Sequence, residues 1–135
     1  MSKKLRRVLL VDDSAADNFF HRRVITKAGV AEEIIIRENG QLAIDYLTTP
    51  QDDGTFPRPE LIFLDINMPV MNGWAFLAAY EQLPEEQRAH IVITMLTTSA
   101  SPTDRERAQQ TDTLMGFEEK PLTVEKVLEI VEQYF

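Results

Sequence analysis

The chain has 135 residues, a length that predicts one domain with its own hydrophobic core. Its 22 acidic against 14 basic side chains give a net charge of −8, which opposes binding to nucleic acid or to an anionic membrane and leaves proteins or cations as the expected partners. Because there is no cysteine, disulfides, thiolate metal sites and cysteine nucleophiles are excluded, and no apolar run approaches membrane-spanning length.

The first half of the chain predicts two strand–helix units followed by a long loop. Short apolar runs are typical of strands buried on both faces, and apolar residues that recur every three or four positions predict helices. Gly29 is placed to end the first helix, whose apolar recurrence is carried by Ala16, Phe20, Val24 and Ala28. The expected elements are a strand at 7–11, a helix at 14–28, a strand at 34–36, a helix after Asn39-Gly40 with Ala43, Tyr46 and Leu47 on one face, and a proline-rich loop at 48–60.

The second half predicts three further units. The segment Ser101-Pro102-Thr103-Asp104 marks a helix start, because it combines an N-cap, a first-turn proline and a carboxylate at the capping-box position. Five alternating units predict an α/β fold of the (βα)5 type, a doubly wound parallel sheet with helices on both faces. The expected elements are strands at 61–64, 91–96 and 114–118, helices that begin near Gly73 and Ser101, and a last helix with the stripe Val124, Val127, Leu128 and Val131.

Charged side chains follow three of the predicted strands. Asp12 and Asp13 come after the first strand, Asp65 after the third and Lys120 after the fifth. The carboxyl ends of parallel strands share one rim, so these side chains should meet in one crevice. Carboxylate oxygens suit Mg²⁺, which usually takes one or two carboxylates plus phosphate oxygens. A remaining carboxylate can act as a nucleophile and form an aspartyl phosphate, with the cation and a lysine neutralising the phosphoryl group.

Each of these residues also has a purely structural interpretation. Asp12-Asp13 could cap the helix that follows, although two adjacent caps are not needed. Asp65 opens a segment that is too long for a tight turn. Lys120 alone would be read as a surface lysine before a turn proline. The hydroxyls of Thr97, Thr98 and Ser99 could cap a helix or hydrogen-bond a phosphoryl oxygen.

Taken together, these residues resemble the receiver domain of bacterial two-component response regulators, a CheY-like family, over essentially the whole chain. An acidic pair alone would be weak evidence, whereas five blocks in this order at strand ends form a specific pattern. The matching stretches are Val8–Asp13, Asp65–Pro69 with Asn72-Gly73, Leu96–Ser99, Gly116-Phe117 and Lys120-Pro121.

The resemblance implies a flavodoxin-like sheet with strand order 2-1-3-4-5 and a role for each matching residue. Asp65 is the implied phosphoacceptor. The implied Mg²⁺ ligands are Asp12, Asp13, Asp65 and the main-chain carbonyl of Asn67. The implied switch and phosphate-binding residues are Thr97, Phe117 and Lys120, and the resemblance also implies a cis peptide bond before Pro121.

The implied function is a cytoplasmic, phosphoryl-accepting regulator that is charged by a histidine kinase or phosphotransfer protein and read by another protein. No nucleic acid or membrane is expected as a partner, and a homodimer is compatible with the resemblance. The chain is expected not to be an enzyme, beyond accepting a phosphoryl group from a donor and hydrolysing the acyl phosphate. Regulation by a phosphorylated switch and service as a phosphorelay intermediate both stay open.

Three other functions fit the residues less well. A haloacid-dehalogenase-type phosphatase also uses an aspartyl nucleophile and Mg²⁺, but it needs a second aspartate where this chain has Asn67. A flavodoxin-like flavin carrier needs a phosphate-binding loop after the first strand, where Asp12 and Asp13 would repel the phosphate. A scaffold that has lost phosphorylation would not need the complete set of acids and lysine.

Some features depart from the commonest receiver pattern. The loop Thr48–Glu60 is longer than usual, and its Pro-Arg-Pro-Glu end is similar to single-domain regulators paired with phytochrome-like kinases. We expect one receiver domain over residues 1–135 and no output domain, so the signal should leave through the fourth helix, the fifth strand and the fifth helix. His21 and His90 are predicted to be solvated, and Trp74 to be a packing residue.

Overall fold

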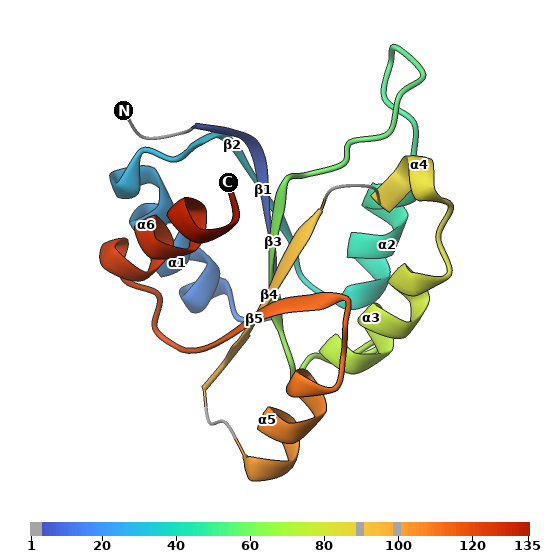
Figure 1. Cartoon of the computed structure of the whole chain (residues 1–135). Coiled ribbons are helices and arrows are strands. Elements are labelled where there is room, and N and C mark those ends of the chain that lie inside the picture. Colours follow the sequence, from blue (N-terminus) through green and yellow to red (C-terminus); the bar gives the residue numbers. More distant parts are fainter. Residues whose placement is uncertain (1–3, 89–90, 99–100) are drawn as a thin grey trace.

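A parallel five-stranded sheet forms the centre of the molecule (Figure 1). The computed structural model describes residues 4–88, 91–98 and 101–135. The strands lie side by side in the order β2-β1-β3-β4-β5, which confirms the predicted fold class. They are β1 (Leu5–Val11), β2 (Ala31–Arg37), β3 (Leu61–Asp65), β4 (Val92–Thr97) and β5 (Leu114–Glu119).

The two central strands explain why the site residues converge. All five residues of β3 are buried, as expected for a parallel strand with helices on both faces. In the register between β1 and β3, Val11 lies opposite Leu64. The next residue of each strand is therefore an aspartate, Asp12 beside Asp65, at the same rim.

Helices cover both faces of the sheet. In Figure 1, α1 and α6 lie on one face, and α2 and α3 lie on the other. The four-residue helix α4 was not predicted, because one turn is too short to show an apolar periodicity. The helices are α1 (Ala15–Ala28), α2 (Gly40–Thr48), α3 (Gly73–Glu81), α4 (Glu85–Arg88), α5 (Pro102–Gln109) and α6 (Val124–Tyr134).

Polar N-caps fix where the five longer helices begin. In each case a side-chain oxygen accepts a hydrogen bond from the backbone N–H three residues later, which satisfies one of the free donors of the first turn. The caps are Ser14, Asn39, Asn72, Ser101 and Thr123.

The buried face of α1 differs from its apolar stripe. Phe20 belongs to the stripe that predicted the helix, yet it is 47% exposed. The buried residues are Asn18, His21 and Ile25. The prediction that His21 is solvated is therefore wrong: its Nε2 accepts a hydrogen bond from the Leu122 backbone N–H, and this contact replaces water. The other predicted surface histidine, at position 90, lies outside the described residues.

On α6, two residues of the predicted stripe, Val127 and Val131, are buried, and Ile130 is buried with them. Leu128, which the same stripe includes, is 38% exposed. Within the described ranges, no helix combines the length and the apolar character that crossing a bilayer requires.

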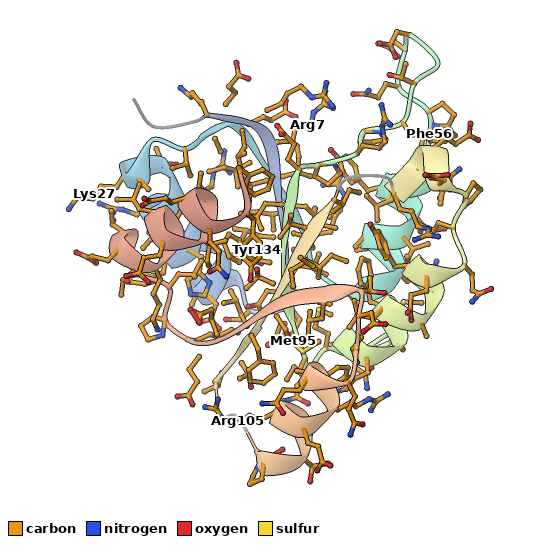
Figure 2. All side chains as sticks on the ribbon, viewed as in Figure 1. Arg7, Lys27, Phe56, Met95, Arg105 and Tyr134 are labelled. Atoms are coloured by element: carbon orange, nitrogen blue, oxygen red, sulfur yellow. The ribbon has the colours of Figure 1, made fainter. Side chains whose placement is uncertain are left out.

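The loop between α2 and β3 is present as predicted, and it lies far from the carboxyl ends of the strands, where the charged residues were expected to meet. Its end is fixed by a hydrogen bond from the Glu60 N–H to the Arg7 carbonyl, and the Arg7 side chain donates to the Pro57 carbonyl. Figure 2 shows Arg7 and Phe56 at one end of the molecule and Arg105 at the other. Because β4 leads into α5 at the end marked by Arg105, the loop lies at the opposite end of the sheet from the carboxyl ends of the strands.

Candidate functional site

The acidic residues predicted from the sequence meet at the carboxyl ends of the central strands. Asp12, Asp13 and Asp65 each place one carboxylate oxygen within 4.8 Å of the others. The Lys120 ammonium nitrogen lies 2.7 Å from Asp12 Oδ2 and 3.4 Å from Asp65 Oδ1. Side chains that are more than a hundred positions apart in the sequence thus form one crevice.

Burial and mutual repulsion shape the charges in this crevice. Asp12 and Asp65 are 4% and 7% exposed, whereas Asp13 is exposed. Burial, followed by the charge of Asp12, raises the pKa of Asp65 to about 6, and Lys120 opposes this rise. Burial alone would lower the pKa of Lys120, but hydrogen bonds to Asp12 and Asp17 outweigh it and raise that pKa above its usual range.

The same donor set fits a hard divalent cation. Three clustered carboxylates carry more negative charge than one ammonium neutralises, and carboxylate oxygens are the ligands that Mg²⁺ and Mn²⁺ prefer. Asn67 lies two residues after Asp65 and is exposed. Its main-chain carbonyl as a further ligand stays a prediction.

The loop from β3 to α3 holds Asp65 through a close approach of backbones. The Gly73 N–H donates to the Ile66 carbonyl over 2.8 Å. A Cβ atom at Gly73 would lie 2.5 Å from the Asp65 carbonyl oxygen, so only glycine lets α3 begin this close to the end of the strand. The start of α2 braces the same loop, because the Gly40 N–H donates to the Met71 carbonyl.

The residues after β4 and β5 border the crevice on its other side. Thr97 is 1% exposed, and its carbonyl accepts the Lys120 N–H over 2.7 Å. The Lys120–Pro121 peptide bond is cis, the isomer that the resemblance implies. Phe117 is half-buried, with the Arg105 guanidinium 5.7 Å from its ring centroid. The switch roles of Thr97 and Phe117 stay predictions, and Ser99 lies outside the described residues.

Three polar residues of α1 belong to the surroundings of the site and were missed in the sequence. Asp17 Oδ2 accepts a hydrogen bond from Lys120 Nζ over 2.9 Å, and Asn18 Nδ2 donates to the Asp12 carbonyl over 2.9 Å. His21 accepts the Leu122 N–H, as described above. The only sequence signal was the spacing of Ser14 and Asp17, which matches a capping box and points to a helix start rather than to a site.

The raised pKa of Asp65 predicts that stability falls with pH in metal-free protein. The unfolded chain loses this proton near 3.8 and the folded chain near 6, so the folded state binds more protons in between. The free energy of unfolding should therefore decrease by about 1–2 kcal/mol as pH rises through this window, the full shift being reduced by water that reaches the crevice. Denaturant titrations in a chelating buffer measure it.

The matched variant for this titration is Asp65→Asn, which keeps the shape of the side chain and removes the proton. It should lack this contribution and be more stable than the natural protein above the window. A natural protein and variant with the same pH slope would contradict the expectation.

Comparison with known proteins gives a consistent result. The model of the response regulator receiver domain family matches residues 8–132. Response regulator Rcp1 of Synechocystis sp. is 36% identical over 97 residues, which are 72% of this chain and 65% of that protein, so the match spans just under two thirds of the relative. A two-component response regulator from Cytophaga hutchinsonii superimposes with a TM-score of 0.87 at 29% identity and covers 98% of both chains.

Two further solved structures are a bacteriophytochrome response regulator and a response regulator with a bound metal ion. The bacteriophytochrome response regulator AtBRR superimposes with a TM-score of 0.79 at 25% identity and covers 97% of this chain and 93% of its own. The Mn²⁺-bound form of response regulator Rcp1 superimposes with a TM-score of 0.72 at 29% identity, over 95% of this chain and 90% of its own.

Proposed function

This chain belongs to the response regulator receiver domain family of two-component signalling, and we propose that its Asp65 is the residue that accepts the phosphoryl group. The observation that carries the proposal is the position of the Asp65 carboxylate, 3.4 Å from the Lys120 ammonium and beside two further carboxylates. This arrangement supplies a nucleophile and a fixed positive charge at one place. A histidine kinase or a phosphotransfer protein would be the donor.

In the proposed reaction, an Asp65 carboxylate oxygen forms a bond to phosphorus while the bond from phosphorus to the donor imidazole nitrogen breaks, and the imidazole keeps the electron pair. Lys120 donates hydrogen bonds to the phosphoryl oxygens that gain charge. Receiver domains bind Mg²⁺ or Mn²⁺ at an acidic cluster, and in this chain Asp12, Asp13 and Asp65 would hold the ion. When bound, the ion supplies positive charge for the phosphoryl oxygens.

Two similarities support a phytochrome-like kinase as the donor. AtBRR is a bacteriophytochrome response regulator, and the loop at 49–60 ends in the Pro-Arg-Pro-Glu sequence that is similar to this subgroup. Phosphotransfer from a purified phytochrome-like kinase, compared with an unrelated histidine kinase, tests the assignment. Equal transfer from both would contradict it.

The signal would leave through the surface of α5, β5 and α6. A groove of about 550 Å³ lies there, lined in part by Arg105, Met115, Phe117 and Tyr134. In the proposed switch, Thr97 turns toward the phosphoryl oxygen and Phe117 moves inward, which changes the floor of this groove. NMR shift mapping across residues 114–119 with and without beryllofluoride would follow the change.

The experiment that tests the proposed function is phosphorylation by acetyl phosphate. With Mg²⁺, intact-mass spectrometry should show the gain of one phosphoryl group, and hydroxylamine should remove it because the product is an acyl phosphate. Asp65→Asn should show no gain, since an amide is not a nucleophile here. Labelling of this variant at the rate of the natural protein would refute the assignment, and loss of labelling only in Asp12→Asn would move it to Asp12.

A further inference from the structure

Asp17 lies on the first turn of α1, and its carboxylate reaches across to the end of β5. Its Oδ2 accepts a hydrogen bond from Lys120 Nζ over 2.9 Å, close to the 2.7 Å that separates Nζ from Asp12 Oδ2. Asp65 Oδ1 is farther away, at 3.4 Å. The ammonium therefore lies closer to Asp12 and Asp17 than to the residue proposed to be phosphorylated.

A capping role does not account for this carboxylate. In a capping box, the acid three residues after the cap would accept the N–H of the cap residue. Here the Ser14 N–H donates to Asp12 Oδ1 over 3.0 Å, and Ser14 Oγ accepts the Asp17 N–H over 3.1 Å. The side chain of Asp17 is thus left to bind Lys120.

The neighbouring residues on α1 keep Asp17 in place. Asn18 Nδ2 donates to the Asp12 carbonyl, and His21, one turn further on, accepts the Leu122 N–H. These two contacts fix α1 to the end of β1 and to the segment that follows Lys120. The side chain of Lys120 is only 9% exposed, so its ammonium would stay in the crevice even without Asp17.

We propose that Asp17 is a positioning residue that restrains Lys120 in the unphosphorylated state and thereby weakens binding of a phosphoryl group at Asp65, an inference that rests on the proposed function. The favourable contact of Asp17 with Lys120 is already complete in the unphosphorylated protein. It cannot become stronger when a phosphoryl group arrives, whereas the repulsion between the carboxylate and the phosphoryl oxygens is new. A group that favours only the starting state shifts the equilibrium away from the bound one.

The test is the affinity for beryllofluoride, a phosphoryl mimic, at saturating Mg²⁺, followed by the fluorescence of Trp74. Asp17→Asn keeps the shape and removes the charge, and it should bind the mimic about three- to fivefold more tightly, as expected for an ion pair whose acid is partly exposed. Asp17→Glu should stay close to the natural protein. The melting temperature of Asp17→Asn should fall slightly, because the variant loses the ion pair and a favourable charge in the first helical turn.

A variant that binds beryllofluoride more tightly but melts at a lower temperature indicates that Asp17 restrains Lys120. If Asp17 had a merely structural role, the variant would bind more weakly and also melt at a lower temperature. The matched control is Glu38→Gln, which removes an exposed carboxylate just after β2, at the same rim. Its affinity should be unchanged. An unchanged or weaker affinity for beryllofluoride in Asp17→Asn overturns the inference. An equal gain of affinity in Glu38→Gln also overturns it, because the cause would then be the overall negative charge of the protein. If the natural protein binds no beryllofluoride and accepts no phosphoryl group, the proposed function itself fails.

Discussion

Replacement of Gly73 by alanine is expected to lower the free energy of unfolding by about 3 kcal/mol, because the new methyl group overlaps backbone atoms that cannot move aside independently. The added Cβ would lie 2.5 Å from the Asp65 carbonyl oxygen and 3.0 Å from the Ile66 Cα. Relief requires α3 to move away from the end of β3. That movement would break the hydrogen bond from the Gly73 N–H to the Ile66 carbonyl and displace Asp65.

Denaturant unfolding followed by circular dichroism measures the loss, and a Mg²⁺ titration of the folded variant should show weaker binding. Gly29→Ala is the matched control. Gly29 has a φ of +70°, but a Cβ there would meet no atom within 4 Å, so the variant carries only the strain of a left-handed backbone, about 1–2 kcal/mol. Gly73 does not have a positive φ, so a loss in Gly73→Ala no larger than that in Gly29→Ala would show that the close contact with Asp65 does not make Gly73 necessary.

Replacement of Lys120 by methionine is expected to slow phosphorylation by acetyl phosphate about 10²- to 10³-fold, the usual effect of removing a donor that stabilises developing charge. The same variant should bind Mg²⁺ more tightly. In the natural protein the ammonium and the ion compete for the Asp12 carboxylate, which lies 2.7 Å from Lys120 Nζ. Without Lys120, the pKa of Asp65 should also rise further in metal-free protein, because Lys120 is the group that lowers it.

The rate is measured by intact-mass spectrometry over time, and Mg²⁺ affinity by the fluorescence of Trp74. Lys126→Met provides the control: Lys126 is half-buried, its ammonium donates to the Glu119 carbonyl, and its loss removes the same charge from the neighbouring helix. The control should keep the natural rate. If Lys120→Met is phosphorylated as fast as Lys126→Met, Lys120 is not the phosphate-binding lysine.

The predicted elements depended on local signals and are confirmed almost throughout. Each strand contains a short apolar run, and each longer helix begins at a polar cap that the sequence displays. The buried runs 8–11 and 61–64 are apolar at every position, so their ends are visible where Asp12 and Asp65 follow. For this reason the sequence alone brought Asp12, Asp65 and Lys120 together, since parallel strands share a rim.

On α1 the error in the predicted buried face arises because some of the buried residues are polar. Periodicity placed Phe20 with the apolar stripe of α1, but the buried face of that helix carries Asn18 and His21. Apolar spacing reports where carbon is buried, whereas a buried polar group depends on a partner in another element. His21 can be buried because its side chain accepts a hydrogen bond from the backbone N–H of Leu122, which is 101 positions later in the sequence.

The sequence therefore determined that a parallel sheet forms and which of its strands end in charged residues. It also determined which carboxylates and which lysine meet at the rim of the sheet. Only the tertiary structure decided which carboxylates lie nearest to the Lys120 ammonium. The hydrogen bond between Asp17 and Lys120 joins residues 103 positions apart, and no role for Asp17 was predicted from the sequence. Local patterns fix secondary structure because backbone and burial act over neighbouring residues. The balance of charge in the crevice depends on differences of a few tenths of an ångström between the distances from Lys120 to its three carboxylates. Those distances are set only when α1, β1, β3 and the end of β5 pack together.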